Sequence, residues 1–170
     1  MDTTLTRHDT NAKTIVRRYM LWSMGAGAIP VPGLDLATVT GVQLKMLSEL
    51  AREYDLPFRE DRGKAIISAL IGGAGSGALA YGLVGSVLKA IPLFGSLLGL
   101  ASVPITAGAV TYAVGNVFLQ HFASGGTFLD FDPARVRAHF ADEMKEGRRV
   151  AADAAADVRR GEGREKAPAV

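Results

Sequence analysis

The stretch that decides the fold is residues 65–129, AIISALIGGAGSGALAYGLVGSVLKAIPLFGSLLGLASVPITAGAVTYAVGNVFLQHFASGGTFL. Lys89 is the single charged residue among these 65, whereas the other 105 residues of the chain carry 35 Asp, Glu, Lys and Arg. A surface helix of a soluble domain shows one polar face to water. The near absence of charge therefore predicts either a core wrapped on all sides by protein or segments embedded in a membrane.

The composition of the whole chain excludes several classes of protein. An apolar content of 48% is too high for a disordered chain, and the absence of Cys excludes a disulfide scaffold and a Cys-based metal site. The 19 Lys and Arg are nearly balanced by 17 Asp and Glu, so we expect no nucleic-acid partner.

Residues 65–129 divide into two uncharged helical segments. The first, residues 65–88, gives about 36 Å of helix at 1.5 Å per residue, enough to cross a hydrocarbon core of about 30 Å. The second extends to Phe122, and Pro104 is expected to kink or split it near Ser102. We expect a membrane-embedded hairpin. A soluble bundle with one very apolar hairpin, and a form that switches between the two, remain open.

Small residues recur along this hairpin at a spacing of four: Gly73 and Gly77, then Ala78, Gly82 and Ser86, and later Gly95 and Gly99. Insertion of the first segment alone would be marginal, because its Ile, Leu and Val are interrupted by Gly and Ser. Small residues at this spacing let helix backbones approach closely, which favours association in lipid. The helix-packing residues predicted on this basis are Gly73, Gly77, Gly82, Gly95 and Gly99.

The charged flanks read as further helices, which makes the predicted fold all-α, with helical hairpins, about five helices and a Gly-rich central hairpin. Apolar steps of three and four indicate a helix near residues 36–54, and Gln43 and Lys45 are expected on its surface. Asp132 and Pro133 are a good start for a polar helix. The predicted organisation is a tail (1–11), a helical membrane-associated domain (12–129, its first helix at 12–29), a polar helix (130–160) and a second tail (161–170).

A turn pattern, I-P-x-x-G, occurs at residues 29–33 and again at residues 91–95. Two hairpins that independently use Pro and Gly as breakers would explain it, and so would an internal duplication. The predicted turn and cap residues are Pro30, Pro32, Gly33, Asp35 and Pro92, with the Asp35 carboxylate near the start of a helix, where it can accept free N–H groups.

No pattern predicts catalysis, a metal or a cofactor. His8, His121 and His139 lack ligand-like spacing, and the Gly-rich residues 72–77 follow a helical run where a phosphate-binding loop would follow a strand. For His121, at the end of an apolar helix, we expect an interfacial structural role.

Several of these residues together resemble a family of unknown function, the YcjF-like domain, number 697 of such families. The resemblance is carried by residues 29–35 (IPVPGLD), then Gln43, Lys45 and Met46, and later by residues 91–96 (IPLFGS) and 106–115. It implies an all-helical, membrane-associated domain linked with dynamin-like or Era-like GTPases, with distant similarity to EcsC-like proteins. It brings no catalytic residues with it.

We therefore expect a non-enzymatic helical protein of a bacterial inner membrane that anchors, recruits or regulates a GTPase in trans or another cytoplasmic partner. Membrane lipid and further copies of the chain are the other expected partners. Lys and Arg flank the uncharged hairpin on both sides, which predicts that both termini are cytoplasmic. A pore-like homo-oligomer is the alternative. An enzyme with an apolar cavity is a third reading, with Asp35, Thr106, Thr111 and Asn116 as its polar groups.

Overall fold

The computed structural model describes residues 2–26, 34–80 and 97–165, and the side chains within 7–26, 38–72 and 103–161. This part of the chain is all-helical and holds no strand, which confirms the predicted class. Its helices are α1 (Asp2–Ala26), α2 (Leu34–Glu53), α3 (Glu60–Ala80), α5 (Leu97–Ala123) and α6 (Arg137–Glu165).

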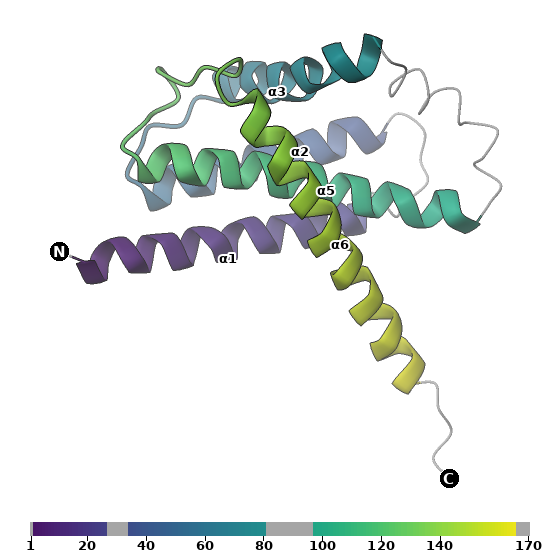
Figure 1. Cartoon of the computed structure of the whole chain (residues 1–170). Coiled ribbons are helices and arrows are strands. Elements are labelled where there is room, and N and C mark those ends of the chain that lie inside the picture. The colour runs from purple at the N-terminus through teal and green to yellow at the C-terminus, as the bar shows by residue number, and fades with distance from the viewer. Residues whose placement is uncertain (1, 27–33, 81–96, 166–170) are drawn as a thin grey trace.

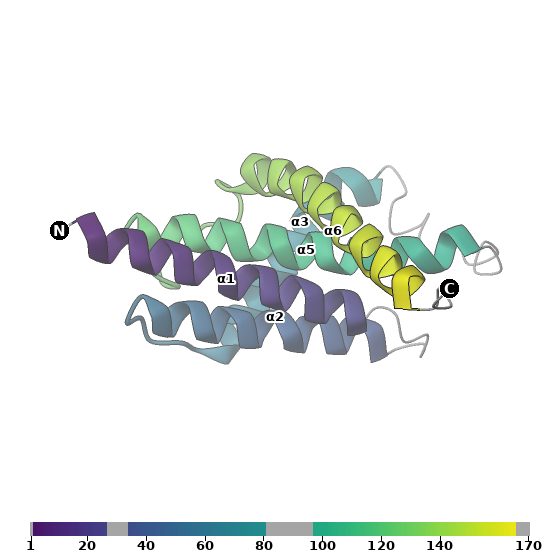
Figure 2. The same cartoon turned by 90° about the horizontal axis from the view of Figure 1, so that it is seen from below.

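Helix α5 lies at the centre of the bundle. It packs against α1, α2, α3 and α6. Beside it, α1 and α2 run antiparallel to each other, and α6 crosses over it (Figures 1 and 2). The C-terminal ends of α1 and α3 and the N-terminal ends of α2 and α5 all point to the same end of the molecule. We call this the apolar end, because the described residues that lead to it, 19–26, 34–44, 65–80 and 97–107, contain a single charged residue, Asp35.

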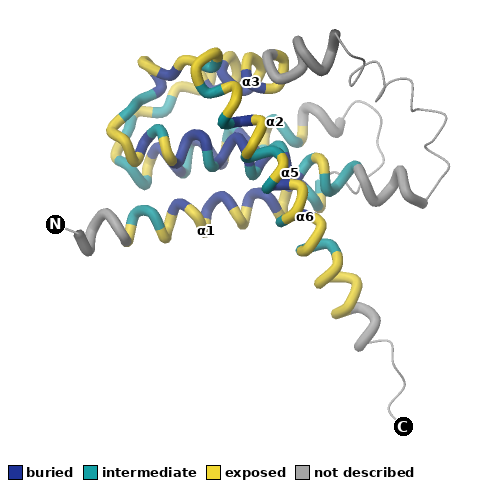
Figure 3. Tube along the Cα trace, in the orientation of Figure 1, coloured by how far each residue is buried: buried dark blue, intermediate teal, exposed yellow. Residues whose placement is uncertain are grey.

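The charge-free sequence of α5 is explained over residues 108–122 by burial in protein. Most side chains there are buried, and Ala113, Val114 and Phe118 have no exposed surface (Figure 3). A helix covered on all sides needs no polar face. Of the two expectations for the uncharged stretch, a protein core therefore holds for this half of α5.

An aromatic cluster closes the core at the opposite end from the apolar end. Phe118 of α5 stacks on Phe131 with ring centroids 4.4 Å apart, and Phe128 lies 5.3 Å from Phe118 and 5.1 Å from Phe122. These rings bring the connection between α5 and α6 back onto the bundle. Burial of each large ring stabilises the fold by about 1.5–3 kcal/mol relative to exposure.

Two helices end in the same hydrogen-bonded motif. The N–H of Gly126 donates to the carbonyl of His121, and that of Gly125 (φ 85°) to the carbonyl of Phe122, so these two glycines end α5. At the end of α2, Leu56 N–H donates to Ala51 and Asp55, with φ 54°, takes the left-handed position. Helix α2 thus ends at Glu53, within one residue of the end of the helix predicted near residues 36–54.

The prediction of a solvated tail at residues 1–11 is wrong for residues 2–11, which form the first turns of α1. Contacts with the end of α2 supply what the polar sequence lacks: Glu53 Oε1 lies 2.9 Å from His8 Nδ1 and accepts a 3.0 Å hydrogen bond from Asn11. Ala12 is completely buried. Most helix stability comes from such tertiary packing, which intrinsic propensity does not report.

Three other predicted boundaries also change. Helix α5 continues through Pro104, so of the two predicted outcomes, a kink or a split, the split is wrong; proline lacks only its own N–H donor, which removes one backbone hydrogen bond. Helix α3 begins at Glu60, before the predicted start at residue 65. Helix α6 runs from Arg137 to Glu165, so residues 161–165 of the tail expected at 161–170 are helical. Asp132 does accept the N–H of Ala134, at 2.9 Å, but in a turn before α6.

Over the described residues, none of the helices combines the length and hydrophobicity needed to cross a bilayer.

Candidate functional site

The described side chains contain no cluster of three or more His, Asp or Glu that could hold a metal ion. Polar groups instead gather in a surface cluster on α1 and α2, a buried group at the junction of α1, α2 and α5, and the contact between α5 and α6.

The surface cluster is built on an ion pair between α1 and α2. Arg18 Nη2 donates to Glu49 Oε2 at 2.6 Å, and the Arg18 guanidinium lies 5.3 Å from the ring centroid of Tyr19 and 5.9 Å from that of Trp22. The two rings meet edge to face with centroids 5.0 Å apart. Tyr19 is buried whereas Trp22 is 51% exposed, so the cluster presents an indole ring to the surroundings.

Ionisation within this cluster follows from its contacts. Burial, and then a hydrogen bond to the charged Glu49, raise the pKa of Tyr19 to about 12. Burial would also raise the pKa of Glu49, but hydrogen bonds from Tyr19 and Arg18 and the charge of Arg18 outweigh it and lower that pKa. At neutral pH the cluster is therefore a neutral Tyr19 beside a paired carboxylate and guanidinium.

Three polar side chains meet inside the bundle, all without exposed surface. Thr111 Oγ1 of α5 lies 2.7 Å from Ser23 Oγ of α1 and accepts a 3.3 Å hydrogen bond from Gln43 Nε2 of α2. Gln43 Oε1 is buried without a partner. This buried triad corrects the expectation that Gln43 lies on the surface of its helix, whereas Lys45 is exposed as expected.

The crossing of α5 and α6 depends on small residues. A Cβ at Gly147 would lie 2.8 Å from the carbonyl oxygen of Ala109, and one at Gly108 would lie 3.3 Å from the Cβ of Ala151. Next to this contact, Glu143 of α6 accepts hydrogen bonds from Asn116 Nδ2, at 3.0 Å, and from Gln120. Side chains of α5 thus hold the first half of α6 closely.

His121 belongs to the turn after α5. Its Nε2 lies 2.9 Å from the carbonyl oxygen of Thr127, its ring meets Phe131 edge-on, and a Cβ at Gly126 would collide with the ring at 2.4 Å. The imidazole fills the inside of the turn, where its polar contacts are structural, and the interfacial part of its expected role stays a prediction.

With this geometry established, comparison with known proteins identifies the family. Residues 2–146 match the family described as "Domain of unknown function (DUF697)". The chain belongs to this family. The resemblance inferred from the IPVPGLD and Gln43–Lys45–Met46 residues is thereby confirmed.

One relative bears a name that carries information. "Magnetosome membrane protein 22" of Magnetospirillum gryphiswaldense is 34% identical over 144 residues, which cover 85% of this chain and 74% of the relative. No solved structure matches the chain significantly.

The residues that carry the DUF697 likeness divide between core and surface. Gln43 and Met46 are buried at the contact of α2 with α5, while Lys45 between them is exposed. Asp35 lies in the first turn of α2, as its predicted capping role requires, but its side chain lies outside the described part. Its role as a cap stays a prediction.

The packing glycines predicted for this DUF697 chain lie where the structure gives no side-chain surroundings. Gly73 and Gly77 belong to α3 and Gly99 to α5, with no surroundings described for them. The other two packing glycines, Gly82 and Gly95, fall outside the described residues. So do four of the predicted turn residues, namely Pro30, Pro32, Gly33 and Pro92. Packing between helices or subunits through these glycines stays a prediction.

The structure does show close glycine contacts that the sequence reasoning missed. A Cβ at Gly115 would lie 2.7 Å from both methyl groups of Val16, and Gly108 and Gly147 are similarly confined. Gly108 and Gly115 stand seven residues apart, one helical face of α5, and this spacing was the available signal. Gly147 lies in a polar helix with no glycine repeat around it, so its contact was not visible in sequence.

Proposed function

We propose that this DUF697 protein is a non-enzymatic, membrane-associated helical protein that holds a cytoplasmic partner, in the first place a GTPase, at the membrane. The observation that carries the proposal is the segregation of charge. Uncharged ends of α1, α3 and α5 gather at the apolar end. Near this end the neighbouring Leu21 and Trp22 of α1 are exposed, and so is Ile71 of α3, a helix that does not contact α1 over the described residues. Adjacent large apolar side chains exposed to the surroundings suit a surface that contacts lipid or protein.

The named relative supports the membrane half of the proposal. It is a magnetosome membrane protein by name, and the aligned residues cover most of both chains. In our proposal the apolar end enters the membrane. Lys and Arg before and after the uncharged stretch then stay on the cytoplasmic side.

The partner half of the proposal rests on α6. Its first half packs on α5, whereas residues 156–161 are all exposed and the helix extends away from the bundle (Figures 1 and 3). Ala151, Ala154 and Val158 continue one helical face from the buried part to the exposed part. An exposed apolar continuation of a packed face suits a partner helix or groove.

Membrane fractionation tests the first half. We expect the full-length protein in the membrane pellet after a high-salt wash and after carbonate extraction. Release by salt alone would reduce the association to a peripheral one, and recovery in the supernatant without either treatment would overturn it.

Co-purification from mild detergent tests the second half. We expect a GTP-binding protein to be retained by the wild type and by Ala156→Glu, and lost with Val158→Glu. Both residues are exposed on α6, but only Val158 lies on the apolar face. Equal retention by the two variants would remove α6 as the docking element, and absence of any GTP-binding protein would remove the GTPase.

A further inference from the structure

We propose that the outer side of α1 and α2 near the apolar end binds the headgroups of anionic phospholipids. This inference rests on the proposed membrane association and specifies its chemistry. The site, which we call the headgroup patch, consists of Arg17, Leu21, Trp22 and Lys45 around the Arg18–Glu49 pair.

The exposed apolar part of the patch suits the interface of a bilayer. Leu21 is 42% exposed and Trp22 51% exposed, one turn before α1 reaches the apolar end. Indole rings concentrate at headgroup level, because they combine a large apolar body with one N–H donor. Trp22 therefore stands at the boundary between the charged part of α1 and the uncharged end of the molecule.

The indole is held in place. It meets the buried Tyr19 ring at 5.0 Å, and the Arg18 guanidinium near both rings is itself tied to Glu49. A side chain that is already ordered loses less entropy when it binds. The Trp22 ring thus packs against Tyr19 and Arg18 on one side and is exposed on the other.

Basic side chains lie on the same surface as the Trp22 ring. Arg17 is exposed next to Arg18, and Lys45 lies one turn before Glu49 on the same face of α2. Among the described residues neither Arg17 nor Lys45 forms an ion pair, whereas Glu49 is neutralised by Arg18. The patch therefore offers two unpaired cations and no unpaired carboxylate, which is complementary to an anionic surface and less so to a zwitterionic one.

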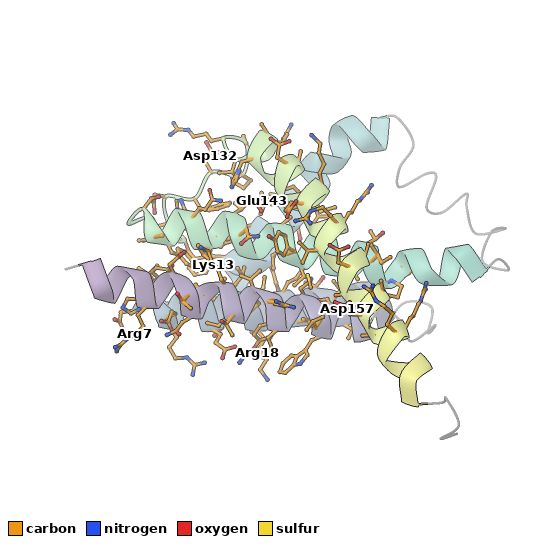
Figure 4. The ribbon with its side chains drawn as sticks, turned by 60° about the horizontal axis from the view of Figure 1, so that its bottom comes forward. Arg7, Lys13, Arg18, Asp132, Glu143 and Asp157 are labelled. Atoms are coloured by element: carbon orange, nitrogen blue, oxygen red, sulfur yellow. The ribbon has the colours of Figure 1, made fainter. Side chains whose placement is uncertain are left out.

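The same side of α1 is basic further along the helix. Arg7 and Arg18 are exposed and project from the same side, away from α5 and α6 (Figure 4). On α6, Lys145, Arg149 and Arg160 pair with acidic residues, while the exposed Arg137 and Arg148 form no ion pair among the described residues. What distinguishes α1 and α2 is that their unpaired cations surround an exposed indole ring, whereas no large aromatic side chain is exposed on the described part of α6. In our proposal a membrane surface therefore meets α1 and α2, and α6 stays available to a partner.

The test uses the full-length protein added from dilute detergent to vesicles of phosphatidylcholine, with or without phosphatidylglycerol. Trp22 is the only Trp of the chain, so its emission reports on the patch directly. We expect a blue shift and tighter binding on the anionic vesicles, weakened by salt. Removal of two basic groups, each worth about 1 kcal/mol at such a surface, should weaken binding of Arg17→Gln/Lys45→Gln about 30-fold.

The matched control is Arg137→Gln/Arg148→Gln, which removes two exposed arginines of α6 that form no ion pair among the described residues. It should stay within about twofold of the wild type, because these residues lie away from the patch. Equal weakening in the two double variants would overturn the patch and leave a general charge effect.

The vesicle series separates the two proposals. Binding of the wild type to both kinds of vesicle with equal affinity would overturn the anionic headgroup patch and support membrane association. Binding to neither would overturn both. A preference for anionic vesicles without a change in Trp22 emission would place the lipid contact elsewhere on the molecule and overturn the patch.

Discussion

Among the described residues, Asp55 is the one residue other than glycine whose backbone φ is positive. Its φ of 54° lies in the left-handed region, where it closes the motif that ends α2. Glycine takes this conformation without the steric clash of a Cβ. We expect Asp55→Gly to raise the free energy of unfolding by about 0.5–1 kcal/mol and Asp55→Ala to lower it, measured by chemical denaturation. An Ala variant as stable as the Gly variant would contradict this account.

The buried triad yields a second prediction at this scale. Thr111→Val keeps the shape of the side chain but leaves Ser23 and Gln43 Nε2 without their partner inside the bundle. The expected loss is about 1–3 kcal/mol in the free energy of unfolding. The control is Thr14→Val, whose hydroxyl bonds to the carbonyl of Thr10 on the exposed side of α1 and should change stability by less than about 0.5 kcal/mol. Equal effects would show that the triad contributes nothing specific.

Residue patterns in the sequence predicted Lys45 correctly and Gln43 wrongly, for one physical reason. Both are polar and belong to the same helix, so composition places both on the surface. Gln43 is buried because Ser23 and Thr111, 20 and 68 positions away along the sequence, supply polar contacts there. Such long-range pairing is invisible to a local pattern, whereas the charge of Lys45 could not be buried without a partner.

At the scale of elements, the apolar pattern predicted which segments are helical better than it predicted where they end. The stop of α5 was visible because Gly125 and Gly126 encode it locally. The start of α1 at Asp2 was not, because Glu53 on another helix supports it. The split at Pro104 was expected from local sterics, but the helix continues on both sides of it.

The crossing of α5 and α6 gives a prediction in which helix propensity and packing oppose each other. Gly147→Ala and Gly161→Ala make the same change in the same helix, and each should favour the helix by up to about 1 kcal/mol. A Cβ at Gly161 meets nothing within 4 Å, but at Gly147 it would lie 2.8 Å from the Ala109 carbonyl oxygen. We therefore expect Gly161→Ala to be neutral or stabilising and Gly147→Ala to destabilise by about 1–3 kcal/mol.

Thermal unfolding followed by circular dichroism distinguishes the two variants. Limited proteolysis adds a second measurement, because a displaced α6 should be cleaved near residues 137–151 in Gly147→Ala only. Equal stability of the two variants would mean that α5 and α6 can move apart at Gly147 without a measurable loss in the free energy of unfolding.

At the scale of the whole molecule, the uncharged stretch has one environment that the structure describes and a second that we propose. Residues 108–122 of α5 are the centre of a protein core, while residues 65–80 of α3 and 97–107 of α5 run toward the apolar end, which in our proposal enters the membrane. A sequence pattern registers only that charge is missing, and a protein core and lipid both require that. The division between them follows from which helices cover α5, and no local pattern determines it.

This division predicts an uneven stability along the chain. Amides of α5 at residues 108–119 are enclosed by four helices and should exchange their hydrogens only on global unfolding. Residues 156–161 continue α6 without cover, so they should exchange on the order of a thousandfold or more faster than residues 137–151 of the same helix. Hydrogen exchange with mass spectrometry of the full-length protein measures this.

Addition of anionic vesicles should protect residues 17–26 from exchange and leave the exchange of residues 156–161 unchanged, because we propose different partners for the headgroup patch and for the exposed end of α6. Protection of residues 156–161 by vesicles would assign that end of α6 to the membrane and contradict its proposed role in docking.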